Sequence, residues 1–228
     1  MCGRFAQHTN PRYYERLLRA RAPGMELPPR FNIAPGAALL ACRTGADGAR
    51  ELAYLHWGLV PHWAQERDAG YSMINARAET VAQKPAYRAP LRQRRCLIAA
   101  DGFFEWQAGR PRKQPYFIRR RDAAPFMFAG LWDRWHGSEP ALESCTIVVA
   151  AASGALAAVH QRMPVVLPSH VYDAWLDPQQ HDATALCALL SPATDAEFEA
   201  YPVSTRVNRA ANDGPELLER YQPRARPR

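Results

Sequence analysis

Residues 96–107 read CLIAADGFFEWQ, two short strand-like runs separated by a turn. The apolar run Cys96–Ala100 is typical of a buried strand, Asp101-Gly102 of a tight turn, and Phe103–Gln107 of the next strand. Outward from it, between about residue 35 and about residue 150, further short apolar segments are bounded by turn residues. These predicted strands are Ala38–Arg43, Glu51–Leu55, Pro115–Arg120, Phe126–Leu131 and Cys145–Ala151.

Helical patterns lie mainly outside this strand-rich region. They cover residues 11–20, 153–159, 169–176 and 183–190, where apolar side chains recur on one side or prolines mark the ends. The sequence therefore predicts an α+β fold: a mixed, largely antiparallel β-sheet or barrel-like core with peripheral helices, in a single domain over residues 1–222. The stretch 223–228, PRARPR, is expected to be a basic, mobile tail.

The composition indicates a basic enzyme-sized chain. Its 29 Lys and Arg exceed its 22 Asp and Glu, which gives a formal net charge of +7 over 228 residues. Such a balance favours a polyanionic partner, nucleic acid first, although a solvated basic surface gives the same count. Basic clusters occur at Arg88–Arg95, Arg110–Lys113 and Arg119–Arg121, and each is either solvated charge or part of a groove that follows a phosphate backbone.

The five cysteines are widely spaced and form no C-x-x-C pair, so we expect neither a disulfide framework nor a metal site, and no cofactor. No segment has the pattern of a signal peptide or of a membrane span. These features predict a cytoplasmic protein that does not contact membranes and becomes nucleoid-associated when it binds DNA.

Cys2 would be unusually reactive if Met1 is removed, because the chain then starts with an amine beside a thiol. The reference pKa values are about 8 for such an amine and about 8.5 for the thiol, so both groups are partly deprotonated near neutral pH. The amine can form a Schiff base with an aldehyde, and the thiol can then close a thiazolidine ring. A second-position cysteine without such a role remains the alternative.

Three other side chains have patterns that fit chemistry. Strand alternation places Glu105 on one face with Phe103, and apolar surroundings would raise the pKa of its carboxyl group and suit it to proton donation. The same alternation groups Asn75 with Arg77 on a polar face. His160 follows an Ala-rich stretch and can exchange protons near neutral pH. Taken alone, the Glu105 pattern fits an exposed strand glutamate equally well. For Asn75 a plain solvent face, and for His160 a structural histidine, is the favoured explanation when each is taken alone.

Taken together and in order, the motifs closely resemble the SRAP domain family (SOS response-associated peptidase), whose members are also called abasic site processing proteins. The resemblance covers nearly the whole chain. The matching segments are MCGRF at 1–5, RFNIAP at 30–35, WGLVP at 57–61, INARAET at 74–80, ADGFFEW at 100–106, FAGLW at 128–132, HQRMP at 160–164, VST at 203–205 and NDGPEL at 212–217.

The resemblance implies roles for individual residues. The catalytic residues of the family match Cys2, Asn75, Glu105 and His160. The DNA-contacting arginines match Arg4, Arg77 and Arg162, and the strand-parting elements match Pro35 and the pair His62 and Trp63. The chain departs from the family at Val149, where relatives often carry a threonine, so a hydroxyl contact from that position is in doubt.

The implied function is that of an abasic-site sensor in the DNA damage response. Cys2 would form a covalent thiazolidine crosslink with the aldehyde of an abasic site in single-stranded DNA and so shield the strand. Self-processing peptidase activity and AP lyase-type activity are implied as well. Two alternatives remain: a glutamine amidotransferase-like hydrolase with an N-terminal cysteine, disfavoured because no Asn-Gly dipeptide is present, and a non-covalent reader of single-stranded or modified DNA.

Overall fold

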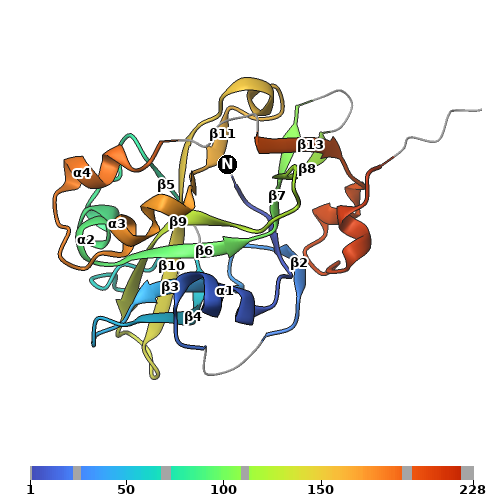
Figure 1. Ribbon diagram of the computed structural model, residues 1–228. Helices are drawn as coiled ribbons and strands as arrows, with labels where there is room; N and C mark the ends of the chain where they lie inside the picture. Colours follow the sequence, from blue (N-terminus) through green and yellow to red (C-terminus); the bar gives the residue numbers. More distant parts are fainter. Residues whose placement is uncertain (1, 23–26, 68–72, 109–112, 192–196, 222–228) are drawn as a thin grey trace, which may run out of the picture.

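Five strands close into a barrel in the computed structural model, which describes residues 2–22, 27–67, 73–108, 113–191 and 197–221 (Figure 1). The order β4-β3-β6-β9-β10 is antiparallel throughout, and a short parallel pairing between β10 and β4 closes the ring. The barrel strands are β3 (Ala38–Thr44), β4 (Arg50–Trp57), β6 (Arg95–Ala100), β9 (Phe126–Trp135) and β10 (Leu142–Ala151). Three short strands extend it: β5 (Asn75–Arg77) and β11 (Arg162–Pro164) pair with β10, and β12 (Val166–Leu167) pairs with β9.

A second, fully antiparallel sheet packs against one end of the barrel. Its order is β13-β8-β7-β1-β2. The strands are β1 (Phe5–Gln7), β2 (Arg30–Ile33), β7 (Gly102–Gln107), β8 (Gln114–Arg120) and β13 (Phe198–Pro202). The predicted α+β class with a largely antiparallel, barrel-like core and peripheral helices is confirmed.

The two strands predicted on either side of Asp101-Gly102 both form, but they belong to different sheets. β6 pairs with β3 and β9 in the barrel, whereas β7 pairs with β1 and β8 in the second sheet. The chain turns a corner between the sheets at Asp101, whose carboxylate accepts hydrogen bonds from the backbone of His8 and Thr9. Gly102 is required beyond this corner because a Cβ atom there would lie 2.2 Å from the ring of Phe117.

Alternate residues of the barrel strands form one apolar cluster, as expected for a sheet whose side chains point in turn to its two faces. Phe5 and Phe103 from the second sheet complete this cluster and pack edge-on against Phe128, with ring centroids 5.8 and 6.0 Å apart. Trp57 is fully buried beside Phe5. Each such side chain contributes about 1.5–3 kcal/mol through burial.

Helices cover the outer face of the barrel, against the opposite set of alternate residues. They are α1 (Pro11–Leu18), α2 (Pro85–Gln93), α3 (Tyr172–Leu176) and α4 (Ala183–Ala188). Short 3-10 helices occupy Gly154–Ala158, Ser169–Val171, Thr205–Asn208 and Pro215–Leu218. The four expected helical regions are thus confirmed, mostly as shorter elements.

Helix α2 lies where the sequence indicated strand-like structure and a basic cluster. Pro85 stands at its first position, which proline tolerates, but Pro90 and the run of arginines obscured the helical pattern. The guanidinium group of Arg95 is buried and donates to the backbone carbonyls of Trp175 and Leu91. The segment Arg88–Arg95 is therefore not a continuous phosphate-binding groove.

Ion pairs partly neutralise the basic cluster Arg119–Arg121, and the cluster Arg110–Lys113 lies mostly outside the described residues. Arg119 pairs with Glu199, and Arg120 pairs with Asp122. Much of Arg110–Lys113, and the predicted tail 223–228, lie outside the described residues. Within the described part of the chain, no helix is long and apolar enough to cross a membrane.

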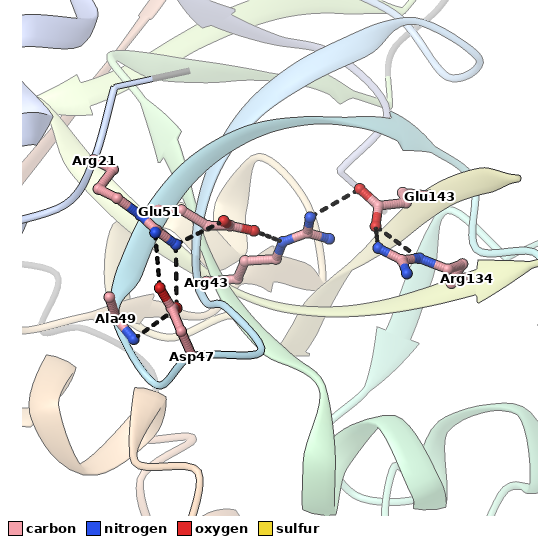
Figure 2. Close-up of polar contacts among 7 residues, drawn as sticks. All are labelled: Arg21, Arg43, Asp47, Ala49, Glu51, Arg134 and Glu143. Atoms are coloured by element: carbon pink, nitrogen blue, oxygen red, sulfur yellow. Dashed lines mark hydrogen bonds and ion pairs between the residues drawn. The ribbon is translucent and has the colours of Figure 1, made fainter. Parts of the chain in front are cut away.

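An ion-pair network ties together β3, β4, β9 and β10 at the barrel end remote from Asn75 (Figure 2). The buried Arg43 contacts Glu51 at 2.8 Å and Glu143 at 2.9 Å, and Glu143 also binds Arg134. The guanidinium carbon of Arg43 lies 4.2 Å from the ring centre of Trp132. The arginine is thus held by two carboxylates and an indole ring, which gives this end of the barrel a structural role.

Candidate active site around Cys2

Cys2 lies at the start of the chain, just before β1, and is completely buried in the same apolar cluster as Phe5 and Val149. Its backbone carbonyl accepts a hydrogen bond of 3.0 Å from Nδ2 of Asn75. Burial raises the pKa of the Cys2 thiol well above its ordinary value, and the charge of Glu105 raises it further. The thiol is therefore held neutral in this environment.

Asn75 is positioned by β5, which runs parallel to β10 and places Asn75 opposite Ile147. Its Nδ2 atom donates to the carbonyls of both Cys2 and Ile74, at 3.0 and 2.7 Å. These two acceptors fix the orientation of the amide. Its Oδ1 atom is buried and accepts no hydrogen bond from the described residues, so its capacity as an acceptor is unused.

Glu105 and His160 form a pair beside Cys2. Glu105 is on β7 and 3% exposed, and its Oε2 lies 3.8 Å from Nδ1 of His160. Burial raises the pKa of Glu105 above its ordinary value, and the nearby His160 partly opposes this rise. Nδ1 of His160 also lies 3.0 Å from the carbonyl of Arg162 and 3.1 Å from its amide nitrogen. A carboxyl group with a raised pKa and an imidazole at this spacing can exchange protons with a reacting group.

The faces that sequence alternation assigned to β7 are confirmed. Phe103 packs into the barrel cluster, whereas Phe104 joins a separate cluster on the other face of the second sheet. The predicted catalytic residues Cys2, Asn75, Glu105 and His160 come from four segments, and the fold gathers them. Their catalytic roles stay predictions.

The three predicted DNA-contacting arginines have different environments. Arg77 is exposed at the end of β5. Arg162 is partly buried on β11 and forms an ion pair with Glu79. Arg4 points into the fold instead, where it donates to Asn32 Oδ1 at 3.0 Å and to the carbonyl of Val207 at 2.8 Å.

The predicted strand-parting residues are all exposed. Pro35 precedes Gly36 in a turn between β2 and β3, and Gly36 has φ +89, a value that favours glycine. Trp63 is 56% exposed, and His62 beside it contacts Asp133. Val149 is buried against the barrel interior, where it presents only apolar atoms to the cluster that contains Cys2.

No group of three or more His, Cys, Asp or Glu side chains within the described ranges could hold a metal ion. An open cleft of about 780 Å³ has His62, Arg94, Trp132 and Asp133 among its lining residues. None of the predicted catalytic side chains lines this cleft, so it is separate from the site around Cys2.

Sequence reasoning missed the residue that anchors the C-terminal segment near the site. Asn32 is 1% exposed, and its Nδ2 atom donates to the carbonyls of Val207, Arg209 and Asn212 at 3.1, 3.1 and 2.8 Å. The same side chain accepts the hydrogen bond from Arg4. Its place in the motif RFNIAP was the available signal, but the partners lie about 175–180 residues away and no local pattern reveals them.

The profile of one protein family, described as SOS response associated peptidase (SRAP), matches residues 1–210. The chain belongs to the SRAP family. This SRAP protein is 40% identical over 201 residues to the abasic site processing protein YoqW of Bacillus subtilis, an alignment that covers 87% of this chain and 89% of YoqW. It is 32% identical over 226 residues to the abasic site processing protein YedK of Escherichia coli, with 96% and 99% covered.

Solved structures show the same architecture. A phage-related protein of Bordetella bronchiseptica superposes with a TM-score of 0.72 at 34% identity, over 89% of this SRAP chain and 94% of that one. A Bacteroides thetaiotaomicron protein has a TM-score of 0.84 at 23% identity, over 97% and 100%, and supports the fold alone.

The ion pair between Glu79 and Arg162 leads to a first prediction. A DNA phosphate must compete with the Glu79 carboxylate for Arg162, and exposed ion pairs contribute about 0.5–1 kcal/mol at the upper end of their usual range. We therefore expect Glu79→Gln to tighten binding of an oligonucleotide about two- to fivefold. Fluorescence anisotropy with a reduced, aldehyde-free abasic oligonucleotide measures this without covalent reaction. Glu216→Gln, which removes a similar pair with Arg206, is the control, and equal effects of the two changes would contradict the prediction.

Proposed function

We propose that this SRAP protein processes abasic sites, and that it does so by joining Cys2 covalently to the aldehyde of an abasic site in single-stranded DNA. One observation carries the proposal: the Cys2 carbonyl is fixed by Asn75 at a buried site that also contains Glu105 and His160. The names of YoqW and YedK support the class of substrate.

The chemistry requires loss of Met1, which is hydrolysis of a peptide bond and frees the amine of Cys2. The amine then adds to the open-chain aldehyde, and loss of one water gives a Schiff base. A buried carboxyl group that stays protonated above its ordinary pKa can donate the proton with which this water leaves, and Glu105 has this property. His160, within 3.8 Å of Glu105, assists opening of the sugar ring and returns protons.

The thiol completes the product. It adds to the carbon of the Schiff base, its proton passes to the nitrogen, and a thiazolidine ring forms without further loss of atoms. Neutral Cys2 brings that proton with it, in agreement with the raised pKa of its thiol. Oδ1 of Asn75 accepts a hydrogen bond from the new amine or from a sugar hydroxyl group.

The same site explains the preference for single strands in this proposal. An abasic nucleotide has no base to unstack, so little energy is needed to bring its sugar into a protein site. Arg77 and Arg162 lie on β5 and β11, the two strands that pair with β10 beside the site, and supply positive charge for the flanking phosphates. The exposed ring of Trp63 offers a surface on which a neighbouring base can stack.

The test uses mature protein, with loss of Met1 confirmed by mass, and three matched oligonucleotides. One carries an abasic aldehyde, one the borohydride-reduced alcohol, and one an intact base. We expect a heat-resistant band on a denaturing gel with the aldehyde alone, with the summed mass of protein and DNA less one water. Binding without a covalent band would favour the non-covalent reader, and glutamine hydrolysis would favour the amidotransferase.

A further inference from the structure

The turn that follows β4 presents the most exposed of the large hydrophobic side chains in the described part of the chain. Trp63, in the turn Pro61–Ala64, is 56% exposed, compared with 44% for Leu17 and 43% for Tyr221. The turn is closed by a hydrogen bond of 2.9 Å from Ala64 N to the carbonyl of Pro61. An exposed indole on a loop is a stacking surface only if the loop beneath it is held in place.

Three side chains of β9 and β10 hold this turn. Oγ of Ser144 accepts a hydrogen bond from Val60 N at 2.8 Å, and Nε1 of Trp135 donates to the carbonyl of Ala64 at 2.7 Å. Between them, Oδ2 of Asp133 accepts from His62 N at 3.0 Å and lies 3.0 Å from Nδ1 of the same histidine. The turn is thus anchored before, at and after His62.

The carboxylate of Asp133 is also held through its other oxygen atom, Oδ1. Asp133 is 2% exposed and lies directly across from Ser144 in the pairing of β9 with β10. Its Oδ1 accepts from Arg134 N at 2.8 Å and lies 3.1 Å from Nε of Arg94. A buried carboxylate is costly without such partners, and hydrogen bonds to a charged group are stronger than those between neutral groups. This carboxylate therefore connects the barrel rigidly to the turn.

We propose that Asp133, supported by Ser144 and Trp135, is a positioning residue that holds Trp63 as a preformed stacking platform for an unpaired base beside the abasic nucleotide. The inference rests on the proposed function. Stacking of a base on an aromatic side chain favours binding of single strands whatever the base, because every base has a flat face. A platform already ordered in the unbound protein retains more of the stacking energy, because binding does not have to order the loop.

The test is a double-mutant cycle on the rate of crosslinking as a function of DNA concentration. Asp133→Asn replaces one accepting oxygen with a donor, so the contact with either His62 N or Arg134 N is lost. We expect Asp133→Asn and Trp63→Ala each to raise the half-saturating DNA concentration about tenfold, which corresponds to about 1.4 kcal/mol, and to leave the rate at saturation unchanged. The double variant is expected to match Trp63→Ala alone.

Asp122→Asn is the control, because Asp122 is an exposed aspartate whose ion pair with Arg120 lies outside the turn. Trp135→Phe removes the bond to Ala64 and keeps an aromatic ring at this position, and is expected to raise the half-saturating concentration even if Asp133→Asn fails to fold. Additive effects in the cycle, a lower rate at saturation, or unchanged half-saturation in both Asp133→Asn and Trp135→Phe would overturn the inference. Absence of any covalent product with the unmodified protein would instead overturn the proposed function.

Discussion

Replacing Cys2 with alanine is expected to abolish the covalent product completely while binding of abasic DNA persists. The N-terminal amine of the mature variant could still form a reversible Schiff base, but the variant has no thiol at this position with which to close a ring. The product would therefore not survive heating on a denaturing gel. Because Cys2 is fully buried and alanine is smaller, the change costs about 1 kcal/mol or less of packing energy, too little to unfold a domain of ordinary stability.

Two further variants sharpen this result. Cys2→Ser keeps the amine, so borohydride should trap its Schiff base, and untrapped Schiff base should pass into β-elimination and cleave the strand. Cys187→Ala is the control for loss of a thiol, because Cys187 lies on α4, away from the site, and is less buried than the other cysteines. A heat-resistant band in Cys2→Ala, or its loss in Cys187→Ala, would contradict assignment of the reaction to Cys2.

Glu105→Gln is expected to slow crosslinking about 10²- to 10⁴-fold, the usual contribution of a positioned general acid. The amide has nearly the same shape and cannot donate the proton with which water leaves. In the unmodified protein, the rate should fall as pH rises through the raised pKa of Glu105, and this limb of the profile should be absent in the variant. Single-turnover rates over a pH series measure both effects.

Glu105→Gln should stabilise the folded protein above the ordinary carboxyl pKa, although it slows crosslinking. The pKa of Glu105 is raised in the folded chain, so the folded state binds the proton more tightly than the unfolded state. The contribution of Glu105 to the free energy of unfolding is present in full below the ordinary carboxyl pKa. It is lost as pH rises through the raised pKa, by about 1.4 kcal/mol for each unit of the shift. We therefore expect Glu105→Gln to melt at a higher temperature than the unmodified protein at pH 8, with little difference at pH 4.

Thermal unfolding of both proteins at the two pH values measures this difference. The expected pattern is that of a site in which a group is buried for reactivity at the expense of stability. A variant that is less stable at pH 8 and equally slow at every pH would show that Glu105 has a structural role and not a role in proton transfer. An unchanged rate would remove Glu105 from the mechanism.

Strand patterns and family motifs predicted much of the site. The alternation in residues 102–107 correctly placed Glu105 on the face of Phe103, because neighbouring side chains of a strand must point to opposite faces. The polar residues of β5 were grouped correctly for the same reason. The motifs then connected Cys2, Asn75, Glu105 and His160, which no local pattern links.

Local sequence patterns did not predict the structure of segments whose conformation or contacts depend on residues far away in the chain. Nothing in residues 96–107 specifies that β6 and β7 turn away from each other into different sheets. Helix α2 contains Pro90 and many arginines, yet it forms because Ala86 and Leu91 are buried against the barrel. Arg4 carries the same charge as Arg77, but only the fold shows that its guanidinium group contacts Asn32 and Val207.

The strand-rich α+β class, the faces of β5 and β7 and the family could all be inferred from the order of residues and from the period of two along a strand. The closure of the barrel, the burial of Cys2 beside Glu105, the pairing of Arg162 with Glu79 and the anchoring of the Trp63 turn by Asp133 became visible in the folded chain alone. The physical reason is that burial and ion pairing depend on distances between residues far apart in the chain. Those distances, and the pKa shifts that follow from them, exist only once the sheets have packed.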